Sequence, residues 1–252
     1  MNTIGIREDE TLEDLQLNGL KLLQKKNGFR FGMDSVLLAD FAGIRPTDSV
    51  VDFGTGTGIL PLLLIGRNKG AAFLAYEIQE TMAEMARRTM EINHLSHRVQ
   101  ICCGDAGEIA HHLPACSVDA VICNPPYGQP GQALVNPTQT KAISRHQNQN
   151  TLVRFFKAAF QILKGKGKIF LVYPAPQMLD LLILLKDTHL EPKRIRFVYP
   201  NAEKAANLVL VEAVKDARPT LQPMPPLIVY DEAGNLTKEL KSVYHIADQN
   251  SV

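Results

Sequence analysis

Short apolar runs alternate with segments of helical periodicity over residues 49–123. The runs carry apolar residues at consecutive positions, which is typical of strands buried on both faces of a parallel sheet. They are predicted at 50–53, 71–76, 99–103 and 118–123. Between them, 59–65 is apolar throughout and 81–93 places three methionines on one stripe, so both segments are predicted helices. This alternation is the pattern of a doubly wound α/β fold.

The same alternation continues beyond a long polar loop that runs to about Asn150. A loop of this length in a compact domain is usually functional or disordered. The two last strands are joined by a short loop, so we expect them to be antiparallel. The remaining predicted elements are helices at 152–163 and 176–186 and strands at 168–173, 194–199 and 207–214. Together they predict an α/β fold with a doubly wound, mostly parallel, seven-stranded sheet.

Both ends of the chain extend this sheet domain. Residues 11–23 have an ambiguous period, 24–28 predict a hairpin turn on an Asn-Gly pair, and a helix is expected from Ser35 with Asp34 as its N-cap. After a proline-rich stretch, an apolar segment, a turn and a helix at 237–244 are expected. We therefore divide the chain into an N-terminal extension packed on the core, a central domain and a C-terminal extension, at 1–45, 46–216 and 217–252.

Composition favours one compact protein. The chain has 252 residues and is 45% hydrophobic, which is sufficient for one large core. It has no apolar run long enough for a membrane span and no leader-like N-terminus, so we expect a soluble, cytoplasmic protein, most simply a monomer. The four cysteines lie in or beside apolar segments without metal-ligand spacing, and the histidines fit surface positions, so we expect no metal.

Charge is distributed unevenly although the net charge is only +1. No Asp or Glu occurs between Ala120 and Leu179, and this span holds seven basic residues: Lys141, Arg145, Arg154, Lys157, Lys164, Lys166 and Lys168. The span predicts positive potential over the half of the molecule that carries the site, and a polyanionic substrate. For the turn 164–168 alone, solvated lysines are the simpler interpretation.

The stretch from Asn124 to Gly128 reads Asn-Pro-Pro-Tyr-Gly and follows a buried strand. Ligands bind at the carboxyl ends of strands in open α/β sheets, and the two prolines restrict the backbone there. The Asn124 amide oxygen and a neighbouring carbonyl are two acceptors that suit an amine on a planar ring or an amide, and Tyr127 adds a flat face. Holding both hydrogens would free the nitrogen lone pair for attack.

Acidic residues and glycines follow the other strands. Asp52 precedes a G-x-G-x-G turn that brings backbone close to a ligand, formed by Gly54, Gly56 and Gly58. A carboxylate there would repel a pyrophosphate but can pair with an ammonium group. Glu77 is placed to bind two ribose hydroxyls, and Asp105 can accept from an adenine amine. Together they predict a pocket for S-adenosylmethionine, although each acid also has a purely structural interpretation.

The chain resembles the class I S-adenosylmethionine-dependent methyltransferases in the order of these motifs. In chain order they are Asp52 with the glycine turn, Glu77, Asp105 and the turn from Asn124 to Tyr127. The segments 29–38 and 226–231 are similar to those of the bacterial tRNA (adenine-N6) methyltransferases that modify the adenine beside the anticodon of valine tRNA, and the likeness covers about 15–245. It implies that the turn formed by Asn124, Pro125, Pro126 and Tyr127 engages the target base. It also implies that Phe31 and Asp34 lie near the cofactor.

Three side chains within the acid-free basic span are candidates for contact with RNA. They are Lys141, Arg145 and His146. Related chains often read Arg-His-Glu where this chain reads Arg145-His146-Gln147. Because Gln147 replaces the glutamate, no acid or base role is assigned there.

Other functions remain open from the sequence. A protein glutamine-amide N-methyltransferase would use the same amide chemistry, but the family carries a larger helical domain ahead of the glycine turn. A DNA or rRNA adenine-N6 methyltransferase is a further alternative. A nicotinamide-dependent oxidoreductase is disfavoured by Asp52 and by the glycine spacing. The simplest alternative is an RNA-binding protein that retains the pocket without catalysis.

Overall fold

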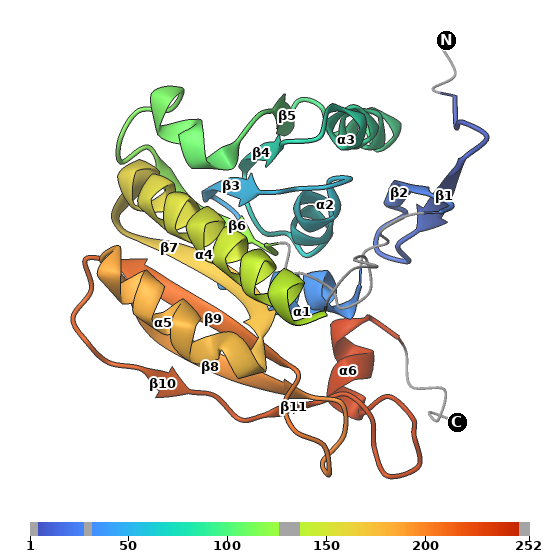
Figure 1. The fold of residues 1–252 in the computed structure, drawn as a ribbon. Coiled ribbons are helices and arrows are strands. Elements are labelled where there is room, and N and C mark those ends of the chain that lie inside the picture. The colour runs from blue at the N-terminus through green and yellow to red at the C-terminus, as the bar shows by residue number, and fades with distance from the viewer. Residues whose placement is uncertain (1–4, 28–31, 126–136, 247–252) are drawn as a thin grey trace.

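A computed structural model describes residues 5–27, 32–125 and 137–246, with the backbone alone for 137–148. The chain forms one large mixed sheet with helices on both faces and a separate two-stranded hairpin near the N-terminus (Figure 1). The helices are α1 (Met33–Phe41), α2 (Ile59–Gly66), α3 (Glu80–Ile92), α4 (Pro137–Ile162), α5 (Met178–Asp187) and α6 (Lys238–Val243), with 3-10 turns η1 (Ala106–His111) and η2 (Ala175–Gln177).

Seven long strands form the body of the sheet, as the sequence predicts. Their order is β5-β4-β3-β6-β7-β9-β8, parallel as far as β7, with β9 antiparallel to both of its neighbours. Two two-residue strands pair with the outer edge of β8. The strands are β3 (Ser49–Phe53), β4 (Ala72–Glu77), β5 (Val99–Cys103), β6 (Val118–Cys123), β7 (Leu163–Pro174), β8 (Leu190–Tyr199), β9 (Leu208–Lys215), β10 (Gln222–Pro223) and β11 (Leu227–Ile228).

Each face of the sheet has its own apolar core. One core packs α1 and α2 against one face, and the other packs α4 and α5 against the opposite face (Figure 1). Neighbouring residues of a strand contribute to different cores, as Val50 and Val51 do, because successive side chains point to opposite faces. The two-sided burial explains why the central strands are apolar without alternation.

The N-terminal hairpin differs from the prediction. Its strands are β1 (Glu10–Asp14) and β2 (Lys21–Lys25), so the turn lies between them rather than at 24–28. The Leu15 amide donates to the Leu20 carbonyl at 3.0 Å, and Gln16 and Asn18 take positive φ inside the turn. Asn tolerates this conformation, so Asn18 suits a turn at this place. Of the Asn-Gly pair on which the turn was expected, Gly28 lies outside the described residues.

Two further boundaries around β7 were predicted wrongly. The helix expected from residue 152 begins at Pro137, so part of the expected loop is helical. Its first half is polar and therefore lacks the apolar stripe by which helices are recognised, whereas proline is common at a helix start. The turn expected at 164–168 belongs to β7, which shifts register between Val118 and Ala120 of β6.

The ends of the chain are tied to the core. Arg88 of α3 forms an ion pair with the buried Glu10 of the hairpin at 2.6 Å. Arg67 at the end of α2 donates to the Val243 carbonyl of α6 at 2.7 Å. The division into 1–45, 46–216 and 217–252 stays a prediction, as do the monomeric state and the cytoplasmic location. No helix in the described ranges is both long and apolar enough to cross a membrane.

Candidate active site

The strand register aligns the predicted site residues along one edge of the sheet. Phe53, the last residue of β3, pairs with Tyr76 of β4 on one side and with Cys123 of β6 on the other. Gly54 and Asn124 directly follow these paired positions. Because neighbouring strands lie about 4.8 Å apart, the glycine turn and the Asn124 turn begin side by side.

The first two glycines of the turn leave space for a ligand, whereas the third is closely packed. Gly54 and Gly56 have positive φ, and a Cβ added at either would meet no heavy atom within 4 Å. Gly58 also has positive φ, but an added Cβ would lie 2.5 Å from Cε of Met90. Helix α2 begins directly after Gly58, so its free amides lie next to the open part of the turn.

Asp52 is fully buried beneath this turn. Its exposed fraction is 0%, and neither carboxylate oxygen has a hydrogen-bond partner among the described residues. Burial raises the pKa of Asp52 to about 7, the nearby Thr55 hydroxyl opposes the rise, and the Glu77 charge adds to it. A cation would stabilise the charged form, so the site fits the ammonium group of an amino acid such as the methionine part of S-adenosylmethionine.

Asp52 and Asn124 lie on the same face of the sheet. Val50 and Ile122, two positions before them on their strands, both belong to the core formed with α1 and α2. Side chains two apart on a strand share a face. A contact of the Asn124 side chain supports this placement. Its Nδ2 donates at 3.1 Å to Oγ of Ser35 in α1, the helix that covers the same face. The sequence predicts Ser35 only as the start of a helix, whereas α1 begins at Met33 after Gly32, and no local pattern indicates the contact with Asn124.

Glu77 stabilises the glycine turn directly. Its Oε2 accepts from the Gly56 amide and its Oε1 accepts from the Gln79 amide, both at 2.9 Å. Each oxygen can accept a further hydrogen bond, so binding of ribose hydroxyls stays a prediction. The next residue, Ile78, is 66% exposed and offers an apolar surface beside Glu77 that sequence reasoning missed.

Asp105 follows β5 and is held from two sides. Its carboxylate accepts from the Gly107 amide at 2.7 Å and pairs with Nη2 of Arg154 in α4 at 2.8 Å. A hollow of about 530 Å³ beside β4, β5 and η1 is lined by Asp105, Gly104 and Tyr76, among others. Contact of the Asp105 carboxylate with an adenine amine remains a prediction.

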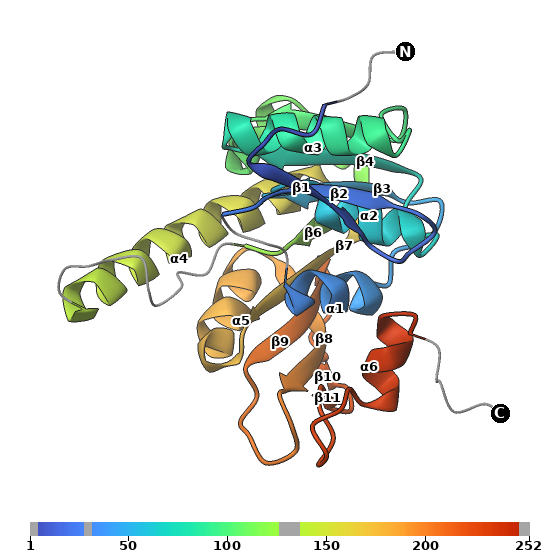
Figure 2. The same cartoon turned by 90° about the vertical axis from the view of Figure 1, so that its right-hand side faces the viewer.

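Several predicted site residues lie outside the described part of the structure. Phe31, Pro126 and Tyr127 are not described, and neither are the side chains of Lys141, Arg145 and His146. The latter three belong to the first half of α4, which projects beyond the rest of the fold (Figure 2). Asp34 lies in the first turn of α1, beside Ser35, where its Oδ1 accepts from the Ser35 amide at 2.9 Å.

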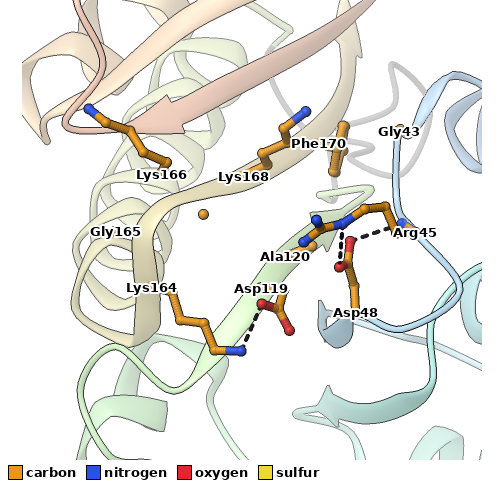
Figure 3. A pocket seen from close by; sticks show the side chains of 11 residues that line it. Gly43, Arg45, Asp48, Asp119, Ala120, Lys164, Gly165, Lys166, Lys168 and Phe170 are labelled. Carbon is orange, nitrogen blue, oxygen red and sulfur yellow. Dashed lines mark hydrogen bonds and ion pairs between the residues drawn. The ribbon is translucent and has the colours of Figure 1, made fainter.

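Part of the acid-free basic span lies away from this edge. Lys164, Lys166 and Lys168 line a hollow of about 380 Å³ near the start of β7, at the opposite end of the parallel strands (Figure 3). Lys164 pairs with Asp119 at 2.7 Å, Lys168 pairs with Glu212 at 3.0 Å, and Lys166 donates to a backbone carbonyl. These three lysines therefore lie outside the predicted site, although Lys164 and Lys168 form ion pairs and are not simply solvated, as the sequence suggested for this turn.

The described residues contain no group of three or more His, Cys, Asp or Glu side chains placed to bind a metal ion.

Sequence comparison finds relatives that are named methyltransferases. A relative named tRNA1(Val) (adenine(37)-N6)-methyltransferase from Aliivibrio salmonicida (strain LFI1238) is 25% identical over 185 residues, covering 73% of this chain and 77% of that protein. One of the same name from Shewanella sp. (strain MR-4) is 28% identical over 214 residues, covering 84% and 89%.

A solved structure described as a predicted O-methyltransferase from Agrobacterium tumefaciens has a TM-score of 0.69 at 23% identity. The match covers 87% of this chain and 100% of that one, and it confirms the predicted fold. Residues 32–188, more than half of the chain, match the family model described as the methyltransferase small domain. The chain belongs to the methyltransferase small domain family.

Proposed function

We propose that this protein transfers a methyl group from S-adenosylmethionine to the exocyclic N6 amine of an adenine in tRNA, at position 37 of a valine tRNA. The names of the relatives supply the substrate. One structural observation carries the chemistry: Asn124 begins its turn beside the glycine turn and on the same side of the sheet as the buried Asp52. An amine held at Asn124 would therefore lie close to a methyl donor held over Asp52.

The residues present fit the methyl donor. The unpartnered Asp52 carboxylate suits its ammonium group, and the open space at Gly54 and Gly56 allows a ligand to approach the backbone. Glu77 and Asp105 would hold the ribose and the adenine of the donor. When bound, S-adenosylmethionine would supply an electrophilic methyl group on a positively charged sulfur, and it would leave as S-adenosylhomocysteine when the methyl–sulfur bond breaks.

Asn124 would hold the target adenine by accepting one N6 hydrogen with Oδ1, and the Pro125 carbonyl would accept the other. An adenine amine is a weak nucleophile because its lone pair is delocalised into the ring. Two acceptors in fixed positions stabilise a pyramidal nitrogen, so the stabilisation is greatest in the transition state. Asn124 does not take the proton, because an amide oxygen is a very weak base; the methylated nitrogen loses its proton to solvent.

The target base must leave its stack to reach this turn. Tyr127 would stack on the base, as aromatic side chains commonly do with unpaired bases in RNA. The basic side chains Lys141, Arg145 and His146 on α4 would contact phosphates of the same RNA.

The test is to incubate the protein with labelled S-adenosylmethionine and tRNA from cells that lack its gene, and to map the modified nucleoside by mass spectrometry. We expect label in N6-methyladenosine next to the anticodon of valine tRNA. Label in a protein glutamine, in DNA or in rRNA, with none in tRNA, would contradict the proposal.

A variant separates binding of the methyl donor from catalysis. Asn124→Ala should reduce kcat by about 100-fold or more, because it removes an acceptor used in the transition state, while the Kd for S-adenosylmethionine changes little. Asn235→Ala, at an exposed turn near the C-terminus, is the matched control and should leave both unchanged. An equal loss of kcat and of donor affinity in Asn124→Ala would mean that Asn124 only supports the fold.

A further inference from the structure

Ser35 lies where it can hold the side-chain amide of Asn124 in place. The Asn124 side chain ends in a carbonyl oxygen and an NH2 group, which differ in function but little in shape. In the structure, Nδ2 is the end that faces Ser35, at 3.1 Å from Oγ. The two residues are 89 positions apart in the chain, so the contact joins helix α1 to the turn after β6.

The orientation matters because the two ends interact oppositely with an amine. If Oδ1 faces the substrate, it accepts a hydrogen from the target nitrogen. If the amide turns by 180° about its last torsion, the NH2 group faces the target amine and two donors oppose each other. That torsion is intrinsically close to two-fold, so the amide needs an outside contact to hold it. A serine hydroxyl can accept from Nδ2, as it does in the structure, or donate to Oδ1, so Ser35 fixes the position and plane of the amide.

Ser35 is well placed to hold the Asn124 amide because it is itself held firmly. It is 3% exposed, and its backbone amide donates to Oδ1 of Asp34 at 2.9 Å. The helix is fixed at its other end, where the Lys69 ammonium donates to the carbonyls of Ala39, Asp40 and Ala42, each at 2.8 Å.

We propose that Ser35 is a positioning residue for the target amine. Its hydroxyl oxygen accepts from Nδ2 of Asn124 and leaves Oδ1 to accept from the substrate. This inference rests on the proposed function, because it names the residue that sets the geometry of the same site. Ser35 need not touch the substrate; it acts through Asn124.

The first experiment is a double-mutant cycle of Ser35→Ala and Asn124→Ala, with kcat measured at saturating methyl donor and tRNA. Loss of one hydrogen bond corresponds to a fall of about tenfold in kcat for Ser35→Ala, with the Kd for S-adenosylmethionine within about twofold of wild type. In the Asn124→Ala background, Ser35→Ala should have no further effect, because the group it orients is gone. Ser35→Thr keeps the hydroxyl and should retain more activity than Ser35→Ala. Ser242→Ala, on the exposed side of α6, is the control for a serine substitution far from the site.

The second measurement needs no catalysis. Proton exchange at the Asn124 side-chain NH2, followed by NMR in the wild-type protein, should be slower than at the exposed Asn235 NH2. The difference should disappear in Ser35→Ala. Burial of Asn124 also slows exchange, so the contact is assigned to Ser35 only if the slowing is lost in Ser35→Ala and kept in Ser242→Ala.

Four results would overturn the inference: full kcat in Ser35→Ala, a loss that adds to that of Asn124→Ala, lower activity in Ser35→Thr than in Ser35→Ala, or equal exchange at Asn124 and Asn235 in the wild type. Failure of the proposed function looks different. In that case the wild-type protein itself transfers no methyl group to tRNA, whatever residue stands at position 35.

Discussion

Replacing Asp52 with Asn should make the protein without its methyl donor less sensitive to rising pH. Asp52 is fully buried and its oxygens lack hydrogen-bond partners in the described structure, so the folded state disfavours the charged form. Asn has nearly the same shape but no ionisation. The variant therefore removes the cost of ionising a buried group and keeps the packing.

The size of the effect follows from the pKa. Burial raises the pKa of Asp52 from 3.8 to about 7. Between these values the unfolded chain has lost the proton while the folded protein still holds it, so stability falls as pH rises. A rise of about three pH units corresponds to a loss of about 4 kcal/mol between pH 4 and pH 7, at 1.36 kcal/mol per unit. That is a large part of the stability of a typical domain.

The assay is urea denaturation of wild type and Asp52→Asn at pH 5, 6, 7 and 8 without S-adenosylmethionine. Other titrating groups are common to both proteins and cancel in the difference. We expect the free energy of unfolding of the variant, relative to wild type, to increase with pH and to level off above about pH 7. Asp187→Asn, an exposed substitution on α5, is measured alongside as the control for an Asp to Asn change away from the site. A difference between Asp52→Asn and wild type that does not change with pH would refute the reasoning.

Three other predictions follow from the same structure. Partial burial tends to raise the pKa of Asp119, but Lys164 and the Ser49 amide and hydroxyl lower it to about 2; Asp119→Asn should therefore lose about 2 kcal/mol of stability above pH 4, a loss that vanishes as pH falls to 2 in the same urea assay. Gly58→Ala should lower the free energy of unfolding by about 1 to 3 kcal/mol, because Gly58 has a φ of 88° and packs closely, and a Tm unchanged from wild type would contradict this. If ionised Asp52 binds the donor's ammonium group, calorimetry should show affinity for S-adenosylmethionine rising with pH up to about 7 in wild type and remaining flat in Asp52→Asn.

The strands of the sheet could be predicted well because their signal is local. The strand at 99–103 matches β5 at both ends, and the antiparallel pairing of β8 with β9 followed from the short loop between them. The hairpin turn could not be placed in the same way. A preference for an Asn-Gly turn is local, whereas the pairing of β1 with β2 also depends on burial of Leu22 and Leu23 in the folded protein.

Only the site residues at or directly after the ends of strands could be predicted from the sequence. The order of the parallel strands brings the turns after β3, β4, β5 and β6 to one edge, so the sequence could place Asp52, Glu77, Asp105 and Asn124 near each other. Partners from distant segments leave no local pattern. The contact of Ser35 with Asn124 and the ion pair of Arg154 with Asp105 therefore required the structure.

The length of helix α4 sets a minimum size for a substrate that contacts both the first turn of the helix and the ends of the strands. It has 26 residues, and Arg154, which holds Asp105, lies 17 positions after Pro137. At 1.5 Å per residue, these points are about 26 Å apart. A single nucleotide is much shorter than that distance. An RNA that contacts the first turn of α4 while its base reaches the ends of the strands must therefore extend over several nucleotides.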